Sequence, residues 1–72
     1  MGKYLPIITT ARCGSLNKAA AELGYTQPSL WYIINNIEND LGVKLFDRTR
    51  RGVTLTEAGK RLVEEMERIE AR

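Results

Sequence analysis

Hydrophobic and polar positions follow a helical period over most of the 72-residue chain, and short glycine-containing segments separate the periodic stretches. The first stretch carries apolar residues at every third position, namely Leu5, Ile8 and Ala11. A helix over residues 3–12 is therefore predicted, and Gly14 ends it.

A second, shorter helix is predicted over residues 18–23, where alanines provide a packing face that another helix can approach closely. Ser15 or Asn17 can cap this helix, and Gly24 ends it. Thr26 then supplies a capping oxygen for a third helix. Two helices joined by a tight turn that contains glycine are typical of a helix-turn-helix unit.

The third periodic stretch begins with the sequence TQPSLWYIINNIE, whose apolar run could also suggest a buried strand. At about 100° per residue, however, four apolar side chains fall in one narrow stripe. They are Leu30, Ile34, Ile37 and Leu41. The opposite face holds Pro28, Tyr32, Asn35 and Asn39, so an amphipathic helix is predicted. Trp31 lies on a flank of the stripe, where core packing and base contact are both open.

A small β-hairpin is predicted next, with residues 43–46 and 53–55 as its β-prone arms and arginines at its tip. Thr56 can cap a final helix, which has an apolar seam at helical spacing. The seam consists of Leu62, Met66 and Ile69. We expect the last turns of this helix to lie away from the other helices and to pack on a second copy of the chain.

Length and composition limit the possible functions. A chain of 72 residues makes one small domain. A single cysteine, Cys13, and the absence of histidine exclude a disulfide framework and a conventional zinc site. Cys13 is interpreted as a small apolar residue near a helix end. There is no histidine base, evident carboxylate pair or glycine-rich phosphate loop, so we expect no enzyme activity, metal or cofactor. No membrane segment or signal sequence is evident, which predicts a cytoplasmic protein.

Charge is unevenly distributed although the net charge is only +2. Residues 44–61 carry six basic and two acidic side chains, whereas residues 26–42 carry two acidic side chains and no basic one. A basic cluster beside a polar helix suits contact with phosphates at one place and with bases or a partner at another.

Two stretches carry a recognisable ordered set of motifs: GSLNKAAAELGYTQPSL at residues 14–30 and IENDLGVKLFDRTRRGVTLTEAG at residues 37–59. This set resembles the N-terminal winged helix-turn-helix domain of LysR-type transcriptional regulators. The resemblance implies a mainly α fold with a three-helix body, a β-hairpin wing and a C-terminal linker and dimerisation helix. It places the DNA-binding domain at residues 1–56 and the start of the linker at residues 57–72. A domain that binds a small-molecule effector would lie outside this chain.

The resemblance also implies that the chain binds double-stranded DNA as a homodimer at two half-sites of an inverted repeat. The third helix would enter the major groove, and the wing would reach the flanking backbone or minor groove. The expected DNA contacts are Lys18, Thr26, Gln27, Pro28, Ser29, Trp31, Tyr32, Asn35, Arg48, Arg50 and Arg51. The expected dimer contacts are Leu62, Met66 and Ile69.

The third helix departs from the family pattern at three successive positions. Trp31 and Tyr32 stand where family members commonly carry serine and then a polar or basic residue, and Ile33 occupies a usually polar position. Two alternatives therefore stay open. One is a winged helix that docks a protein partner through Trp31 and Tyr32. The other is a winged helix like that of molybdate-responsive regulators, although their glycine-rich wing is absent here.

Overall fold

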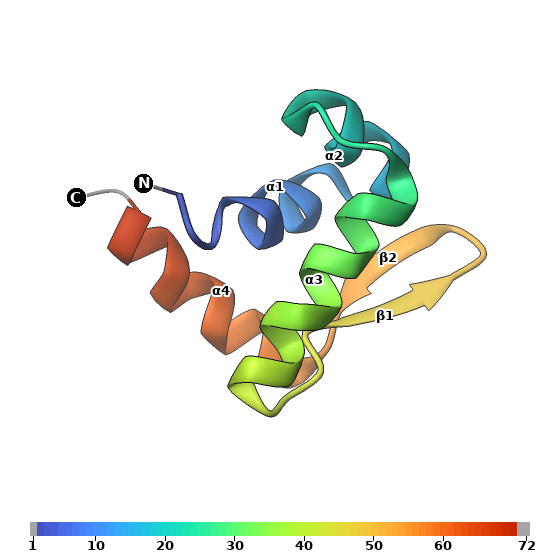
Figure 1. Cartoon of the computed structure of the whole chain (residues 1–72). Helices are drawn as coiled ribbons and strands as arrows, with labels where there is room; N and C mark the ends of the chain where they lie inside the picture. The colour runs from blue at the N-terminus through green and yellow to red at the C-terminus, as the bar shows by residue number, and fades with distance from the viewer. Residues whose placement is uncertain (1, 71–72) are drawn as a thin grey trace.

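Four helices and one antiparallel hairpin make up residues 2–70, which the computed structural model describes (Figure 1). The elements are α1 (Leu5–Cys13), α2 (Leu16–Leu23), α3 (Gln27–Leu41), β1 (Phe46–Thr49), β2 (Gly52–Leu55) and α4 (Glu57–Glu70). Helix α1 packs against the other three helices and against β2, and it forms the centre of the fold. The predicted mainly α architecture is confirmed. Within this part of the chain no helix is long and apolar enough to cross a membrane.

The predicted caps and stops are present. The Ser15 hydroxyl, rather than Asn17, caps α2 by accepting a hydrogen bond from the backbone three residues on at 3.3 Å. Thr26 caps α3 and Thr56 caps α4 in the same way, at 3.2 Å and 2.9 Å. Each cap satisfies an N–H group that the first turn of a helix otherwise leaves unpaired.

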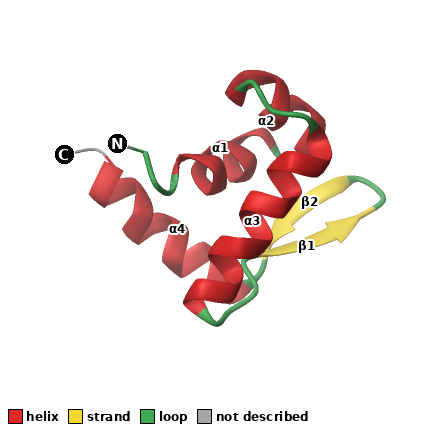
Figure 2. Cartoon of the chain, viewed as in Figure 1, coloured by secondary structure: helices red, strands yellow, loops and turns green. Residues whose placement is uncertain are grey.

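A three-residue connection links α2 to α3 (Figure 2). Gly24 adopts a φ of 80°, a left-handed conformation that glycine accepts without strain. The next amide, that of Tyr25, donates to the carbonyl of Ala20 at 2.9 Å and closes the end of α2. This turn sends the chain into α3 at a large angle to α2, as a helix-turn-helix unit requires.

The buried face of α1 differs from the apolar spacing of its sequence. Leu5 is 45% exposed, whereas Ile7 and Thr10 are completely buried. Thr10 tolerates burial because its hydroxyl donates a hydrogen bond to the carbonyl of Pro6 at 2.7 Å. The central position of α1 explains this difference in burial, since neighbouring elements cover more than one of its faces.

The prediction that the last turns of α4 lie away from the body is wrong. Helix α4 runs beside α1, with its C-terminal end close to the N-terminal end of α1 (Figure 1). The backbone N–H of Tyr4 donates to the carboxylate of Glu70 at 3.2 Å. Val63 and Met66 are 6% and 3% exposed, and both belong to the core of this chain.

Only part of the predicted seam on α4 therefore remains free. Met66 is buried in its own chain and is not available to a second copy in this arrangement. Leu62 is half-buried and Ile69 is 58% exposed. A dimer contact through Leu62 and Ile69 stays a prediction.

Candidate nucleic-acid interface

The N-terminal half of α3 presents a mixed polar and aromatic surface. Thr26 holds the start of the helix as its cap, so that Gln27 and Pro28 occupy the first turn. Along the same face follow Trp31, which is half-buried, and Tyr32, which is 68% exposed. Leu30 and Ile34 on the opposite face are fully buried and hold the helix in place.

The hairpin begins later in the chain than the sequence indicated. Strand β1 starts at Phe46, and residues 43–45 form a loop instead of the predicted first arm. Arg48 therefore lies within a strand, paired with Val53, and not at the tip. Because side chains alternate along a strand, Arg48 shares the inner face with Phe46 and Val53, which are buried.

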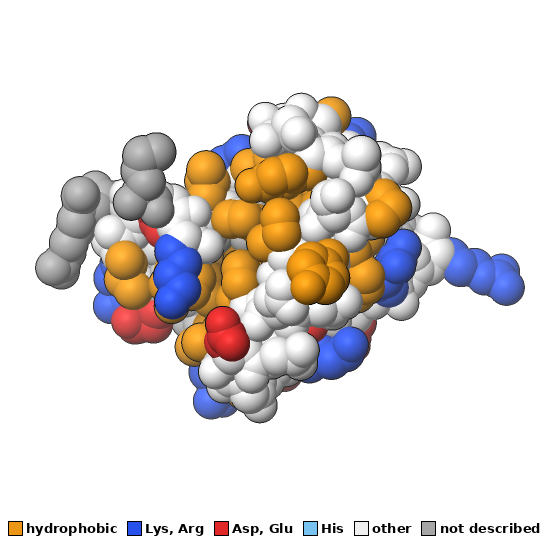
Figure 3. All heavy atoms as spheres, in the orientation of Figure 1, with side chains coloured by type: hydrophobic (Ala, Val, Ile, Leu, Met, Phe, Trp, Pro, Cys, Tyr) orange, Lys and Arg blue, Asp and Glu red, His pale blue; other side chains and the backbone are white. Residues whose placement is uncertain are grey.

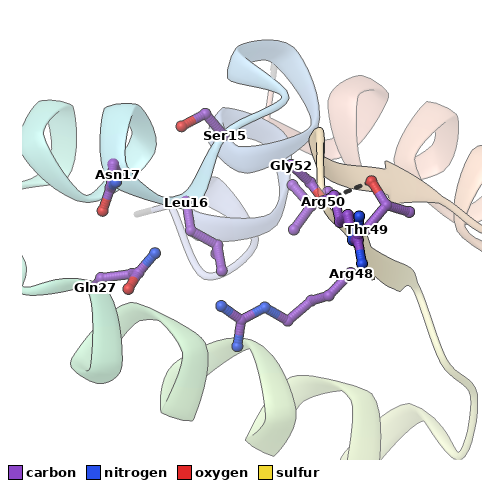
Figure 4. A pocket seen from close by; sticks show the side chains of 9 residues that line it. Ser15, Leu16, Asn17, Gln27, Arg48, Thr49, Arg50 and Gly52 are labelled. Carbon is purple, nitrogen blue, oxygen red and sulfur yellow. Dashed lines mark hydrogen bonds between the residues drawn. The ribbon is translucent and has the colours of Figure 1, made fainter.

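Arg48 consequently extends back to the recognition surface. Its guanidinium carbon lies 5.0 Å from the centre of the Trp31 ring. Figure 4 shows the side chain reaching from the hairpin over α3 in the direction of Gln27. A cation over an indole face is attracted by the ring electrons, so this contact links the wing to α3. It also settles the position of Trp31, which packs against the core under Arg48.

Arg50 and Arg51 form the tip of the hairpin and are both exposed. The Thr49 hydroxyl accepts a hydrogen bond from the Arg51 amide at 3.2 Å and donates one to the Gly52 carbonyl at 3.1 Å. Gly52 has the predicted positive φ, 130°. The tight turn thus directs two guanidinium groups away from the body of the domain.

Two clefts lie on either side of Arg48. The first, which we call the wing cleft, has a volume of about 180 Å³ and separates the hairpin from the starts of α2 and α3 (Figure 4). Its walls include Ser15, Asn17, Gln27, Arg48 and Arg50. The second, which we call the helix cleft, has a volume of about 330 Å³ and opens along the outer face of α3. Its walls include Leu16, Gln27, Pro28, Trp31, Tyr32 and Asn35, with Arg48 at the border.

Most of the predicted contact residues are brought together around these clefts. Gln27 and Arg48 line both of them. Lys18, Thr26, Ser29 and Arg51 are exposed but line neither cleft. The wall residues that the sequence did not predict as contacts are Ser15, Leu16, Asn17, Thr49, Gly52 and Val53. In the sequence, these residues are marked by their positions next to a helix cap or a turn.

Glu38 has a structural role that the apolar stripe of α3 did not reveal. It is 6% exposed, whereas Leu41, which the stripe placed in the core, is 36% exposed. The Glu38 carboxylate accepts hydrogen bonds from the backbone N–H groups of Leu45 at 2.7 Å and Phe46 at 3.1 Å. The chain that leads into β1 crosses this end of α3 and supplies donors that an apolar side chain could not satisfy.

The arginines around the clefts have no acidic partner. The ion pairs within residues 2–70 involve Arg12, Lys60 and Arg68, and none involves Arg48, Arg50 or Arg51. In Figure 3, basic side chains lie at the hairpin and one extends well beyond the body, while hydrophobic side chains are exposed over α1 and α3. Unpaired guanidinium groups at a turn are suited to phosphate oxygens.

Cys13 and Glu22 form a separate pair away from this surface. The thiol donates a hydrogen bond to the Glu22 carboxylate at 2.9 Å. This hydrogen bond, together with partial burial, raises the pKa of Cys13 above its ordinary value. The same bond lowers the pKa of Glu22, and Arg12 adds to that effect. Among the described residues no three acidic or cysteine side chains come together in a way that could hold a metal ion.

Comparisons with known proteins point to one family. Residues 7–60 match the family model described as "Bacterial regulatory helix-turn-helix protein, lysR family". The chain is 50% identical over 62 residues to the HTH-type transcriptional regulator GltR of Bacillus subtilis, which covers 86% of the chain and 21% of GltR. It is 52% identical over 58 residues to the regulator TdcA of Escherichia coli, covering 81% of the chain and 19% of TdcA. The chain thus spans about a fifth of the length of these relatives.

Solved structures give the same result. The crystal structure of a CbnR_DBD–DNA complex superimposes with a TM-score of 0.90 and 35% sequence identity. The match covers 96% of this chain and 79% of that one. Nearly the whole arrangement of helices and hairpin is therefore shared with a domain seen bound to DNA.

Proposed function

The chain belongs to the LysR family of bacterial regulatory helix-turn-helix proteins, and we propose that it is a sequence-specific DNA-binding domain. Helix α3 would enter the major groove, and the arginine-rich wing would contact the flanking backbone or minor groove. The observation that carries this proposal is the match of the complete fold to the DNA-bound CbnR domain. The family match also favours this function over a winged helix of the molybdate-responsive type.

The surface chemistry supports the same function. The outer face of α3 offers side-chain amides at Gln27 and Asn35, which can make paired hydrogen bonds with adenine. Arg48 borders this face, and Arg50 and Arg51 extend from the hairpin tip. Within residues 2–70 none of the three has an acidic partner, so they can neutralise phosphates. Lys18, exposed near the start of α2, would add a further phosphate contact.

The proposal extends to assembly and location. Two copies would bind the two half-sites of an inverted repeat, associating through the free side of α4 at Leu62 and Ile69. Residues 57–72 would begin a linker to an effector-binding domain in a longer regulator. Residues 71–72 lie outside the described part of the chain, and α4 (Glu57–Glu70) also completes the core described above. Binding to duplex DNA in a bacterial cell would place the protein in the cytoplasm.

A titration of duplex DNA tests the proposal. Duplexes recovered by selection from random sequence should bind more tightly than scrambled duplexes of the same length and composition. Affinity for both should fall steeply as the salt concentration rises, because neutralised phosphates release counterions. Equal affinity for selected and scrambled duplexes at every salt concentration would contradict specific DNA binding.

A protein-docking role for Trp31 and Tyr32 predicts a different result. Chemical-shift mapping with the selected duplex should perturb α3 and the hairpin tip together if the chain binds DNA. Shifts confined to Trp31 and Tyr32, without the tip at Arg50 and Arg51, would favour docking of a protein partner instead. The exposure of Tyr32 makes it a sensitive reporter for both cases.

A further inference from the structure

We propose that the helix cleft holds the 5-methyl group of a thymine in the half-site, and that Trp31 determines this specificity. The inference rests on the DNA binding proposed above and names what the outer face of α3 reads. The helix cleft opens on the face of α3 that would enter the groove, with a volume of about 330 Å³. Three of its wall residues, Pro28, Trp31 and Tyr32, offer ring surfaces against which an apolar group can pack.

The chemistry of the walls matches an A·T base pair. In the major groove thymine is the base that carries a methyl group, and its partner adenine presents an acceptor at N7 and a donor at N6. Rings at Pro28 and Trp31 can bury the methyl group, while the amide of Gln27 or Asn35 can pair with the adenine. The ring side chains and the amide side chains line the same cleft, so a single A·T base pair can contact both.

The composition of α3 also disfavours a guanine at this place. The commonest contact to guanine comes from an arginine or lysine that donates to O6 and N7. Residues 26–41 contain neither of these side chains. Arg48 borders the cleft from the hairpin, but its guanidinium group lies over the Trp31 ring.

Trp31 is the wall residue that the structure holds in place. Its side chain is half-buried against the core, and the Arg48 guanidinium carbon lies 5.0 Å from the ring centre. Tyr32, by comparison, is 68% exposed. A fixed ring discriminates better than a mobile one between thymine and a base without the methyl group, because little side-chain freedom is lost when the methyl group binds.

Replacement of single thymines by deoxyuridine tests the proposal, because this change removes the methyl group and leaves base pairing intact. In the selected duplex, replacement of one thymine in each half-site should lower the affinity of the protein about fourfold. This factor corresponds to about 0.8 kcal/mol, the free energy of burying one methyl-sized group. Trp31→Ser should bind the thymine and uracil duplexes equally. Trp31→Phe should keep part of the difference, and Asp40→Asn, at an exposed position near the C-terminal end of α3 and outside the walls of the cleft, should keep all of it.

Several results would overturn the inference. One is selected half-sites without thymine, and another is a wild-type protein that does not distinguish any thymine from uracil. A folded Trp31→Ser variant, checked by circular dichroism, that keeps the full fourfold difference would show that the methyl group is held elsewhere. If Trp31→Ser does not fold, the wild-type scan and Trp31→Phe decide the question. Failure to bind any duplex is a distinct result, which would overturn the proposed function first.

Discussion

The carboxylate of Glu38 accepts a hydrogen bond from the backbone N–H of Leu45 at 2.7 Å. Glu38 lies in α3, and Leu45 immediately precedes β1, so this contact helps to join α3 to the hairpin. The carboxylate also accepts the N–H of Phe46 at 3.1 Å, and the side chain is almost fully buried. The distance between the two DNA-facing elements thus depends on a buried polar group.

Loss of the Glu38 carboxylate should destabilise the domain. Glu38→Ala leaves two buried N–H groups without an acceptor, and we expect the free energy of unfolding to fall by about 2 to 4 kcal/mol. Urea denaturation followed by circular dichroism measures this change. Asp40→Ala, at an exposed position on the same helix, should change little. Equal unfolding midpoints for the two variants would contradict the role of Glu38.

A methyl group at Gly59 should also destabilise the fold, although alanine is the better helix former. Gly59 is buried in the first turns of α4, and a Cβ atom there would overlap the carbonyl oxygen of Leu45. Backbone must shift to make room, so Gly59→Ala should cost about 1 to 3 kcal/mol. Thermal unfolding measures the effect, with Lys60→Ala as an exposed control on the same helix. A higher melting temperature for Gly59→Ala would show that the close approach is absent in solution.

The wing and α3 should contribute to DNA binding in different ways. Arg50→Ala and Arg51→Ala should weaken binding to all sequences and reduce the dependence of log K on log salt by about 0.9 for each lost phosphate contact. Gln27→Ala should instead relax the preference at one base pair by about 1 to 3 kcal/mol. Fluorescence anisotropy with selected and scrambled duplexes separates the two effects. Arg68→Ala is the control, because Arg68 is paired with Glu65 near the far end of α4.

If Arg50→Ala and Arg51→Ala changed the affinity for selected duplexes by a different factor from the affinity for scrambled duplexes, the hairpin tip would contribute to sequence specificity and not only to phosphate contact. If Gln27→Ala weakened both duplexes equally, base reading by the first turn of α3 would be ruled out. The salt dependence is the more informative measurement for the tip, since it reports the number of phosphates contacted.

Cys13 should react slowly with alkylating reagents. The Glu22 hydrogen bond raises the pKa of the thiol, so at a given pH less of the reactive thiolate is present than in the unfolded chain. The pH profile of iodoacetamide labelling should therefore lie at higher pH for the folded protein than for the protein in urea. Glu22→Ala should shift the folded profile to lower pH, and Glu64→Ala should not. Identical profiles for Glu22→Ala and the wild type would show that the pair does not form.

The two apolar residues at the end of α4 should have separable roles. Met66→Ala should destabilise the folded chain by about 2 to 5 kcal/mol, since the side chain is buried in the core. Ile69→Glu should leave stability nearly unchanged and weaken self-association, because Ile69 is 58% exposed. Denaturation and sedimentation equilibrium measure the two properties. A wild-type chain that stays monomeric at high concentration and on DNA would contradict dimerisation through α4.

Local sequence determined several of the helix boundaries. Thr26 and Thr56 cap their helices as predicted, and Gly24 ends α2, because these interactions involve residues only a few positions apart. The ordered motifs likewise identified the family, since they record the spacing of several such local features. Tyr32 was correctly placed on the solvent side of α3 by helical geometry alone.

Tertiary structure decided which side chains those elements bury and which they bring together. Glu38 is buried because backbone donors from a later segment meet it, and Met66 is buried because α4 folds back along α1. Arg48 was expected at the hairpin tip, yet the start of β1 at Phe46 turns it inward onto Trp31. Pairing with β2 places Arg48 on the same face of the hairpin as the buried Phe46 and Val53, so its side chain extends toward α3. The contact between Arg48 and Trp31 could therefore be seen only in the folded chain.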